Sequence, residues 1–277
     1  MHSSQFRQHA VFAEALARWR LTPDGEAIVT HAARLLPVRW QGRPAMLKVA
    51  TAEEERQGGL LMSWWHAKGA AEIFAAEEDA IVMERGGAPL SALVAAGRDD
   101  EATIILCEVA AKLHAARSDP PPSLVPLQAW FADLQPAAAR EGGLLARSAA
   151  EARALLADPC EETVLHGDIH HDNVLDFGPR GWLVIDPKGL FGERGFDYAN
   201  LFCNPDKGDG GAFASSPERF SHRLTLVTEH ARVERRRMLQ WIIAWTGLSA
   251  TWQIEIDESP AIDFAIMKLA IGAIDQG

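Results

Sequence analysis

The first third of the chain contains short runs in which apolar and polar residues alternate, a pattern that predicts half-buried β-strands. Residues 27–30, 34–40 and 45–50 form three such runs, and residues 41–44 between the last two have turn composition. A further apolar run over residues 80–85 predicts another strand. We therefore expect a small β-sheet near the N-terminus.

Helical periodicity accounts for most of the remaining sequence. The predicted helices lie near residues 4–18, 52–66, 101–117 and 233–252. In the last of them Trp241, Trp245 and Trp252 fall on one side of the helix. Such a stripe could line a substrate pocket, but large apolar side chains at this spacing more often pack a core. We interpret these tryptophans as core residues.

A second kind of pattern occurs in the middle of the chain. Two short apolar runs, 174–176 and 182–185, flank residues 177–181, which have turn composition, and together they predict a β-hairpin. Asp186 follows the returning strand directly. A carboxylate is therefore expected at the edge of the core, beside the loop that precedes the hairpin.

Lys48 is the one charged residue within an otherwise apolar strand pattern. Because side chains alternate along a strand, Met46, Lys48 and Ala50 should face one way and Leu47 and Val49 the other. Lys48 can then reach into a cleft while its neighbours pack the sheet.

Length and composition indicate a compact enzyme of two lobes. The chain has 277 residues, whereas single domains usually have about 100–150. Hydrophobic residues make up 48% of it, which can fill such cores. The cysteines at 107, 160 and 203 are too few and too scattered for a disulfide framework or a metal motif. We interpret them as ordinary residues of a protein in a reducing compartment.

Charge and hydropathy limit the classes of partner that we expect. The sequence has no signal-peptide pattern and no run of 18 apolar residues, so we expect a cytoplasmic protein without a membrane span. The formal net charge of -11 argues against a general nucleic-acid binder. An acidic surface could instead attract a small cationic substrate.

The chemistry is concentrated in residues 164–187. His166 and Asp168, followed by Asn173, match the spacing H-x-D-x-x-x-x-N of the loop in which kinases place a base and a metal ligand. Asp186 adds a hard oxygen donor of the type that Mg²⁺ prefers. Phosphoryl transfer needs this combination, because it depends on positioning and on the neutralisation of charge.

The same segment allows two other interpretations. Asp and Asn in loops often do no more than bond to nearby backbone, but the loop, the hairpin and the terminal carboxylate occur together. A zinc site could use His166, Asp168, His170, His171 and Asp172. Adjacent histidines point in different directions, however, and no second cluster with zinc-like spacing follows, which disfavours zinc.

Residues 165–205, which include HGDIHHDNVL and RGWLVIDPKGLFGERGFDYANLFCNP, resemble the catalytic core of the aminoglycoside phosphotransferases. More narrowly, they resemble the streptomycin 6-kinase and hydroxyurea phosphotransferase group. The resemblance implies an α+β, two-lobe fold similar to that of protein kinases. It implies a β-rich, nucleotide-binding N-lobe over residues 1–86. The helical C-lobe, residues 87–277, would carry the catalytic loop and the metal and acceptor sites.

The same resemblance implies roles for particular residues. Asp168 would be the catalytic base, and Asn173 and Asp186 would bind Mg²⁺. Lys48 would hold the phosphates of ATP and pair with a glutamate of the next helix. We choose Glu55 for that partner.

The same resemblance implies further roles. Glu54 is the second choice for the partner of Lys48. Backbone groups of Met83, Glu84 and Arg85 would pair with adenine in a hinge that ends at two glycines. Asp197 would brace the catalytic loop without reacting.

The sequence departs from protein kinases in three respects. It has no G-x-G-x-x-G loop over the phosphates, and Pro23-Asp24-Gly25 is at most a turn in the corresponding region. Gly167 stands where most protein kinases have Arg, and no A-P-E segment occurs. These departures favour a constitutively active small-molecule kinase over a regulated protein kinase.

The acceptor implied by the resemblance is streptomycin or a related aminoglycoside. Its cationic groups could be bound by acidic residues of the C-terminal part, for which the candidates are Asp206, Asp209, Glu255, Asp257, Glu258 and Asp263. A kinase of hydroxyurea or of a metabolite, and a nucleotide-binding pseudokinase or interaction protein, remain alternatives. The sequence leaves open the phosphorylated hydroxyl, the choice between ATP and GTP, and the oligomeric state.

Overall fold

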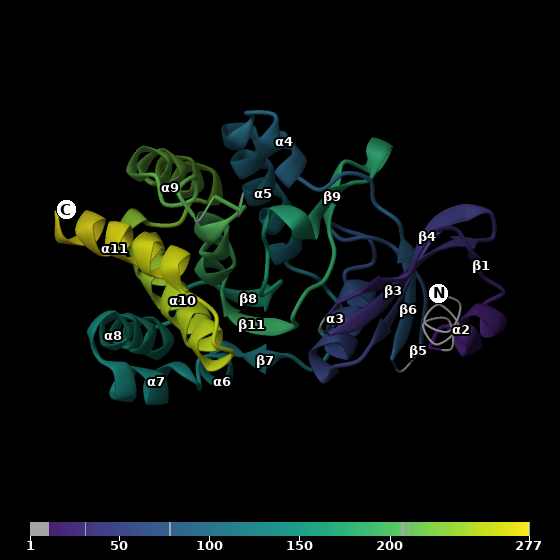
Figure 1. Ribbon diagram of the computed structural model, residues 1–277, viewed down its shortest axis with the longest axis horizontal. Helices are drawn as coiled ribbons and strands as arrows, with labels where there is room; N and C mark the ends of the chain where they lie inside the picture. Colours follow the sequence, from purple (N-terminus) through teal and green to yellow (C-terminus); the bar gives the residue numbers. More distant parts are fainter. Residues whose placement is uncertain (1–10, 31, 78, 206–207, 210, 277) are drawn as a thin grey trace.

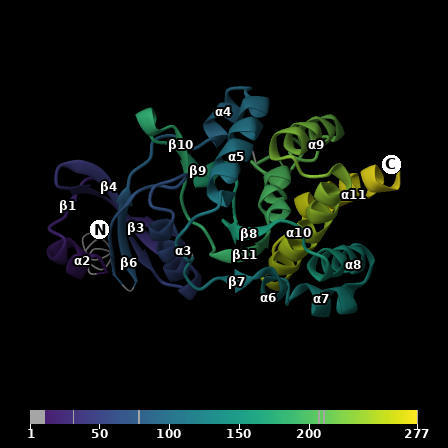
Figure 2. The ribbon, with the colours of Figure 1, turned by 180° about the vertical axis from the view of Figure 1, so that it is seen from behind.

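The computed structural model describes residues 11–30, 32–77, 79–205, 208–209 and 211–276, without the side chains of residues 53–55. The chain forms two lobes that lie side by side (Figure 1). In the described residues the N-terminal lobe is a sheet with the helices α2 (Ala13–Arg18) and α3 (Glu53–Trp64), and the C-terminal lobe is mainly helical. The first described residues and the C-terminus lie at opposite ends of the molecule, as the view from behind also shows (Figure 2).

The sheet of the N-lobe is antiparallel, with the order β1-β3-β4-β6-β5 and with β2 paired to β3. Its strands are β1 (Thr22–Pro23), β2 (Ile28–Val29), β3 (Ala33–Trp40), β4 (Arg43–Ala50), β5 (Ile73–Glu77) and β6 (Ala80–Glu84). The strands predicted over 27–30, 34–40, 45–50 and 80–85 are confirmed to within two residues. Strand β5 was missed, because Ile-Phe-Ala-Ala-Glu lacks a clear alternation.

The two faces of this sheet have different partners. Leu36, Leu47 and Val82 belong to a core on the face covered by α2 (Ala13–Arg18). Met46 and Met83, which are directly opposite each other on β4 and β6, pack toward the core of the C-lobe. The predicted alternation along β4 is therefore confirmed, and it points Lys48 toward the other lobe.

The C-lobe is built around one long helix. The helices of this lobe are α4 (Ser91–Ala95), α5 (Asp99–His114), α6 (Leu127–Trp130), α7 (Leu134–Glu141), α8 (Gly143–Ala157), α9 (Pro217–Ala231), α10 (Arg235–Glu255) and α11 (Ala261–Asp275). Helix α10 packs against α8 and α11, while α5 packs against α9. None of the helices in the described ranges is long and apolar enough to cross a membrane.

Two small sheets support the central loops. Strand β11 (Leu190–Glu193) pairs in parallel with β7 (Val125–Pro126) and antiparallel with β8 (Glu162–Leu165). The predicted hairpin is confirmed, with β9 (Val174–Asp176) antiparallel to β10 (Trp182–Val184). The loop that carries Asp168 therefore runs from β8 to β9.

Both edges of the hairpin are hydrogen-bonded to other segments: residues 69–71 of the N-lobe, which precede β5, and the connection between the lobes at residue 87. On one edge the Val184 amide donates to the Gly69 carbonyl, 3.0 Å away, and the Ala71 amide donates to the Val184 carbonyl, 2.9 Å away. On the other edge the Gly87 amide donates to the Asp176 carbonyl over 2.7 Å. The hairpin thus fastens the N-lobe to the loop that contains Asp168.

The proposed boundary between the lobes is at residues 86 and 87. The sheet ends at Glu84 and α4 begins at Ser91, so this boundary lies in the connection between them. A Cβ atom on Gly86 would lie 2.7 Å from the Leu175 side chain, which is closer than real contacts allow. We keep residue 86 as the proposed end of the N-lobe.

Helix α3 (Glu53–Trp64) makes a second contact between the lobes. Gly58 is buried in it, and a Cβ atom there would lie 2.3 Å from the carbonyl oxygen of Pro187, the residue after Asp186. The absence of a side chain at Gly58 therefore lets α3 approach the Asp186 loop.

We predict that Gly58→Ala lowers the free energy of unfolding by about 1–3 kcal/mol, because the new methyl group meets a backbone atom. Gly272→Ala is the matched control in another helix, since nothing lies within 4 Å of its new methyl group. Alanine should stabilise that helix by roughly 0.5–1 kcal/mol. Urea unfolding measures both variants, and equal effects would contradict the proposed close approach.

Candidate active site

The loop between β8 and β9 closes on itself around Asp168. The side-chain amide of Asn173 donates to the backbone carbonyl of Asp168 over 2.9 Å. Gly167 has a φ of +87°, which favours glycine, and a Cβ atom there would lie 2.8 Å from Leu190. The residue that replaces the arginine of protein kinases is therefore required by the local backbone and by its packing.

Two asparagines of the segment after Asp197 orient the Asp168 carboxylate. Asn204 donates to Oδ1 of Asn200 over 2.8 Å, and Asn200 donates to Oδ1 of Asp168 over 2.8 Å. The second carboxylate oxygen lies 4.0 Å from Nζ of Lys188. Nε2 of His170 lies 4.0 Å from Oδ1. Asp168 is thus held in one orientation between an amide and two basic side chains.

Lys48 and Asp186 meet at the other side of the same loop. They are 138 positions apart in sequence, yet Nζ of Lys48 donates to Oδ1 of Asp186. The Lys48 side chain is 7% exposed and that of Asp186 is 39% exposed. Asp186 has a φ of +67°, which is uncommon for a residue with a side chain. A strained backbone at an acidic residue is typical of functional sites.

A buried carboxylate supports the start of the loop. Asp197 accepts hydrogen bonds from the backbone amides of His166 (2.9 Å) and Gly167 (2.7 Å) and from Nε2 of His114 (2.8 Å). Burial by itself raises the pKa of the Asp197 carboxyl, but the interactions with His114 and with these amides outweigh it. The net pKa therefore lies below its usual value. The predicted bracing role of Asp197 is confirmed.

A buried arginine holds the far end of the loop. Arg223 is 2% exposed, donates to Asp99 over 2.6 Å and lies 3.5 Å from Nε2 of His171. Burial lowers the pKa of the Arg223 guanidinium to about 9, and burial, followed by the charge of Arg223, lowers the pKa of His171 well below its usual value. His171 is therefore neutral at pH 7 and packs as part of the core.

The predicted hinge residues lie where β6 ends. Met83 is buried, while the side chain of Glu84 forms an ion pair with Arg180 in the turn of the hairpin. The guanidinium of Arg85 donates to Asp24 over 2.6 Å. Ion pairs thus tie the hinge both to the hairpin and to the turn after β1.

The predicted glutamate partner of Lys48 cannot be placed. Glu55, and Glu54 as the second choice, lie in the first turn of α3. Their side chains are outside the described part of the structure. This pairing stays a prediction.

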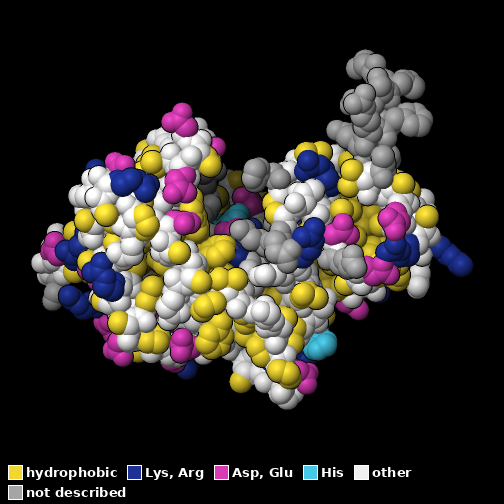
Figure 3. Space-filling view, turned by 90° about the horizontal axis from the view of Figure 1, so that it is seen from below, with side chains coloured by type: hydrophobic (Ala, Val, Ile, Leu, Met, Phe, Trp, Pro, Cys, Tyr) yellow, Lys and Arg dark blue, Asp and Glu magenta, His cyan; other side chains and the backbone are white. Residues whose placement is uncertain are grey.

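A cavity of about 300 Å³ opens beside Asp168. Its lining residues are Trp130, Gly167, Asp168, His170, Lys188, Asn200, Asn204, Trp245, Ser249 and Trp252. From below, Figure 3 shows a hollow between the two lobes where histidine and acidic side chains reach the surface. The prediction that the tryptophan stripe of α10 packs the core is confirmed for Trp241 and Trp245, which are buried, although Trp245 also borders the cavity. Trp252 packs against the same core but is only partly buried, and it lines the cavity as well.

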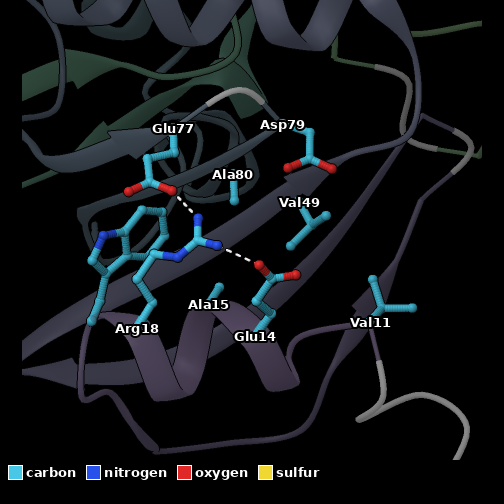
Figure 4. A pocket seen from close by; sticks show the side chains of 9 residues that line it. Val11, Glu14, Ala15, Arg18, Val49, Glu77, Asp79 and Ala80 are labelled. Atoms are coloured by element: carbon cyan, nitrogen blue, oxygen red, sulfur yellow. Dashed lines mark hydrogen bonds and ion pairs between the residues drawn. The ribbon is translucent and has the colours of Figure 1, made fainter.

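A larger cavity of about 480 Å³ lies on the N-lobe, next to α2 (Figure 4). Arg18 crosses it and pairs with Glu14 and Glu77. Val49, on its wall, points to the opposite face of β4 from Lys48. This cavity is therefore separate from the cluster around Asp168.

The sequence did not single out several residues of the site. Asn200, Asn204, Lys188, Trp130 and Ser249 carry no motif by themselves, and the only signal was the four-residue spacing of the two asparagines. Within the described residues, no group of three or more His, Cys, Asp or Glu side chains is arranged to hold a metal ion. Carboxylate and amide oxygens of Asp186 and Asn173 are the donors available for Mg²⁺ at this position.

Comparison with known proteins identifies relatives over nearly the whole chain. A protein family described as aminoglycoside/hydroxyurea antibiotic resistance kinases matches residues 18–257. A streptomycin 3''-kinase of Klebsiella pneumoniae is 51% identical over 267 residues, which cover 94% of this chain and 100% of that protein. A streptomycin 6-kinase of Streptomyces glaucescens is 28% identical and covers 94% and 87%, respectively.

Solved structures show the same fold. A thermostable mutant of the aminoglycoside phosphotransferase APH(4)-Ia, in a ternary complex with AMP-PNP and hygromycin B, superposes with a TM-score of 0.65. The alignment covers 95% of this chain and 99% of that one at 14% identity. This likeness, together with the sheet and the helical lobe described above, confirms the predicted two-lobe, protein-kinase-like fold.

The support of the loop by Asp197 leads to a prediction. Asp197→Asn keeps the shape of the side chain but turns an NH₂ group toward groups that donate to the carboxylate, so the free energy of unfolding at pH 7 should fall by roughly 1–3 kcal/mol. Asp119→Asn, at an exposed side chain, is the control.

The pH dependence tests the same interaction. Because the pKa of Asp197 is lowered in the folded protein, its ionised form stabilises the fold above about pH 4, and this contribution is lost as the pH falls through the folded pKa. The asparagine variant has no such contribution to lose. Urea unfolding at pH 7 and in acid should therefore show a difference between wild type and Asp197→Asn that shrinks at low pH. A constant difference would contradict a charged Asp197.

Proposed function

The chain belongs to the aminoglycoside/hydroxyurea antibiotic resistance kinase family, and on this premise we propose that it transfers the γ-phosphate of ATP to streptomycin. The 51% identity to a streptomycin 3''-kinase, over the whole of that protein, supports streptomycin as the acceptor and its 3''-hydroxyl as the reacting group. The observation that carries the chemistry is the Asp168 carboxylate, oriented by Asn200 and exposed to a cavity beside Lys188.

Asp168 is the proposed catalytic base. It accepts the proton of the acceptor hydroxyl while the acceptor oxygen bonds to the γ-phosphorus. The bond from that phosphorus to the β,γ-bridging oxygen breaks, and ADP leaves. Asn204 donates to Asn200, and Asn200 donates to Oδ1 of Asp168. One oxygen of the Asp168 carboxylate is therefore occupied, and we assign the second oxygen to the acceptor hydroxyl.

The residues on the other side of the loop fit ATP and Mg²⁺. Lys48 supplies a positive charge, and Asp186, directly beside it, supplies a hard anionic donor. Asn173 uses its amide NH₂ on the Asp168 carbonyl, which leaves its amide oxygen as the donor for a metal ion. When bound, Mg²⁺ offsets the charge of the phosphates. We propose Asn173 and Asp186 as its protein ligands and Lys48 as the phosphate contact.

The remaining assignments rest on the family. We propose that backbone groups of residues 83–85 pair with adenine, because the side chains of Glu84 and Arg85 are engaged in ion pairs. Glu55 is the proposed partner of Lys48. ATP would then bind between an N-lobe of residues 1–86 and a C-lobe of residues 87–277. A cytoplasmic reaction fits this donor, since ATP is made there.

The base assignment is tested by Asp168→Asn. Without a group that accepts the proton, turnover should fall by roughly 10²–10⁴-fold, while binding of Mg²⁺-ATP measured by calorimetry should persist. Asp172→Asn, at an exposed neighbour in the same loop, is the control and should retain activity. ADP release coupled to an indicator enzyme measures the rates. Wild-type turnover by Asp168→Asn would refute the assignment.

The acceptor is tested by a panel. We expect ADP release with streptomycin and none with hydroxyurea, and phosphorus–proton correlation NMR of the product should place the phosphate on the 3''-oxygen. A phosphate on the 6-oxygen would contradict the assignment of the hydroxyl. Turnover of hydroxyurea alone would contradict streptomycin as the acceptor.

A further inference from the structure

Three tryptophans form one wall of the cavity beside Asp168. Trp130 ends α6, whereas Trp245 and Trp252 belong to α10. The rings of Trp130 and Trp252 meet edge to face, with centroids 5.4 Å apart and an interplanar angle of 76°. The indole N–H of Trp252 lies 3.3 Å from Asp133, so its polar edge is engaged outside this wall. Aromatic side chains thus make up this part of the cavity lining.

The charges around the cavity are unusual for a site that accepts a cation. Asp168 is the one carboxylate among the described lining residues, and Lys188 and His170 are basic. None of the described acids that the sequence offers for acceptor binding is among these lining residues. The described candidate acids lie elsewhere: Asp263 is 2% exposed, and Asp209 accepts hydrogen bonds from the amides of Gly211 and Phe213.

The remaining candidate acids add no carboxylate to the described cavity lining. Glu255, Asp257 and Glu258 are exposed and lie outside the cavity lining, and Asp206 lies outside the described residues. Asp263 accepts from Gln253 and Cys203 and is therefore engaged in the interior. Burial raises the pKa of its carboxyl, which further weakens it as an anion.

We propose that Trp130, Trp245 and Trp252 form a subsite that binds an organic cation of the acceptor, a guanidinium or alkylammonium group, through their ring faces. This proposal rests on the proposed function, because streptomycin carries groups of both kinds. Ring faces attract cations, and a flat guanidinium also stacks on an indole. Neutral aromatic rings can bind the cation without placing a second carboxylate beside Asp168, the proposed base.

The position of Lys188 adds a reason for this arrangement. Its ammonium lies 4.0 Å from Asp168, where the reacting hydroxyl and the transferred phosphoryl group meet. A cationic part of the acceptor is repelled from that point and attracted to the aromatic wall. The two features together would orient the acceptor with its hydroxyl toward Asp168.

The subsite is tested by comparing Trp252→Leu with Trp252→Phe. Leucine removes the ring while keeping apolar bulk, so KM for streptomycin should rise by about 3- to 30-fold. Phenylalanine keeps a ring face and should recover most of this loss. KM for ATP and kcat should stay within about 2-fold, since neither variant touches the nucleotide side. Trp40→Leu, on the N-lobe, is the matched control and should behave as wild type.

A second measurement needs no variant, because it uses inhibitors of the wild-type enzyme. In the wild-type enzyme, methylguanidinium and dimethylammonium should each inhibit competitively against streptomycin, at ionic strength matched with NaCl. N-methylurea, which is neutral and of the same shape as methylguanidinium, should not. Whichever cation inhibits more strongly identifies the group that the rings prefer.

The outcomes separate the two proposals. If the wild-type protein does not phosphorylate streptomycin, the proposed function fails. If it does, but Trp252→Leu leaves KM for streptomycin unchanged and methylguanidinium inhibits no better than N-methylurea, the aromatic subsite is wrong while the function stands. An equal rise of KM for ATP in Trp252→Leu would also overturn the subsite, because it would indicate general damage.

Discussion

The backbone hydrogen bonds on the two edges of the β9–β10 hairpin are the constraint on which the site depends. One edge is bonded to residues 69–71 of the N-lobe and the other to the connection between the lobes at residue 87, so the hairpin joins the N-lobe at two places. The hairpin also ends in Asp186, and the sheet brings Lys48 against it. Secondary-structure pairing, which is cooperative and insensitive to salt, therefore positions a charged pair whose members are remote in sequence.

A buried charge performs the corresponding task for the loop before the hairpin. Burial raises the pKa of the Asp197 carboxyl, but the interactions with His114 and with the loop backbone outweigh it, so the net pKa is lowered and the charged form is favoured. A backbone held in this way tolerates the left-handed conformation at Gly167 and keeps the Asp168 carbonyl within reach of Asn173. The shape of the loop thus depends on Asp197 and His114, which are not among the residues that line the cavity.

The sequence was most informative where structure is local. Alternation over 34–40 and 45–50 and the hairpin at 174–185 were correct, because each strand pairs with its neighbour in the chain. The three-stranded sheet of β7, β8 and β11 was not predicted, since its short strands pair with partners remote in sequence and no turn joins them as one joins β9 to β10. Asn200 was missed for a related reason: its partner Asp168 is 32 positions away, and no periodicity reports such a contact.

The tryptophans of α10 show that a helical pattern identifies one side of a helix but not the position along its axis. Trp241, Trp245 and Trp252 share one side of a helix of 21 residues, about 32 Å long. A helical wheel superposes them, yet they differ in position along the axis. Trp241 packs against Phe131 and Phe196 in the core, while Trp252 lies near the end of the helix, beyond that layer, against Trp130. The same periodicity therefore makes a core at one end of α10 and a cavity wall at the other.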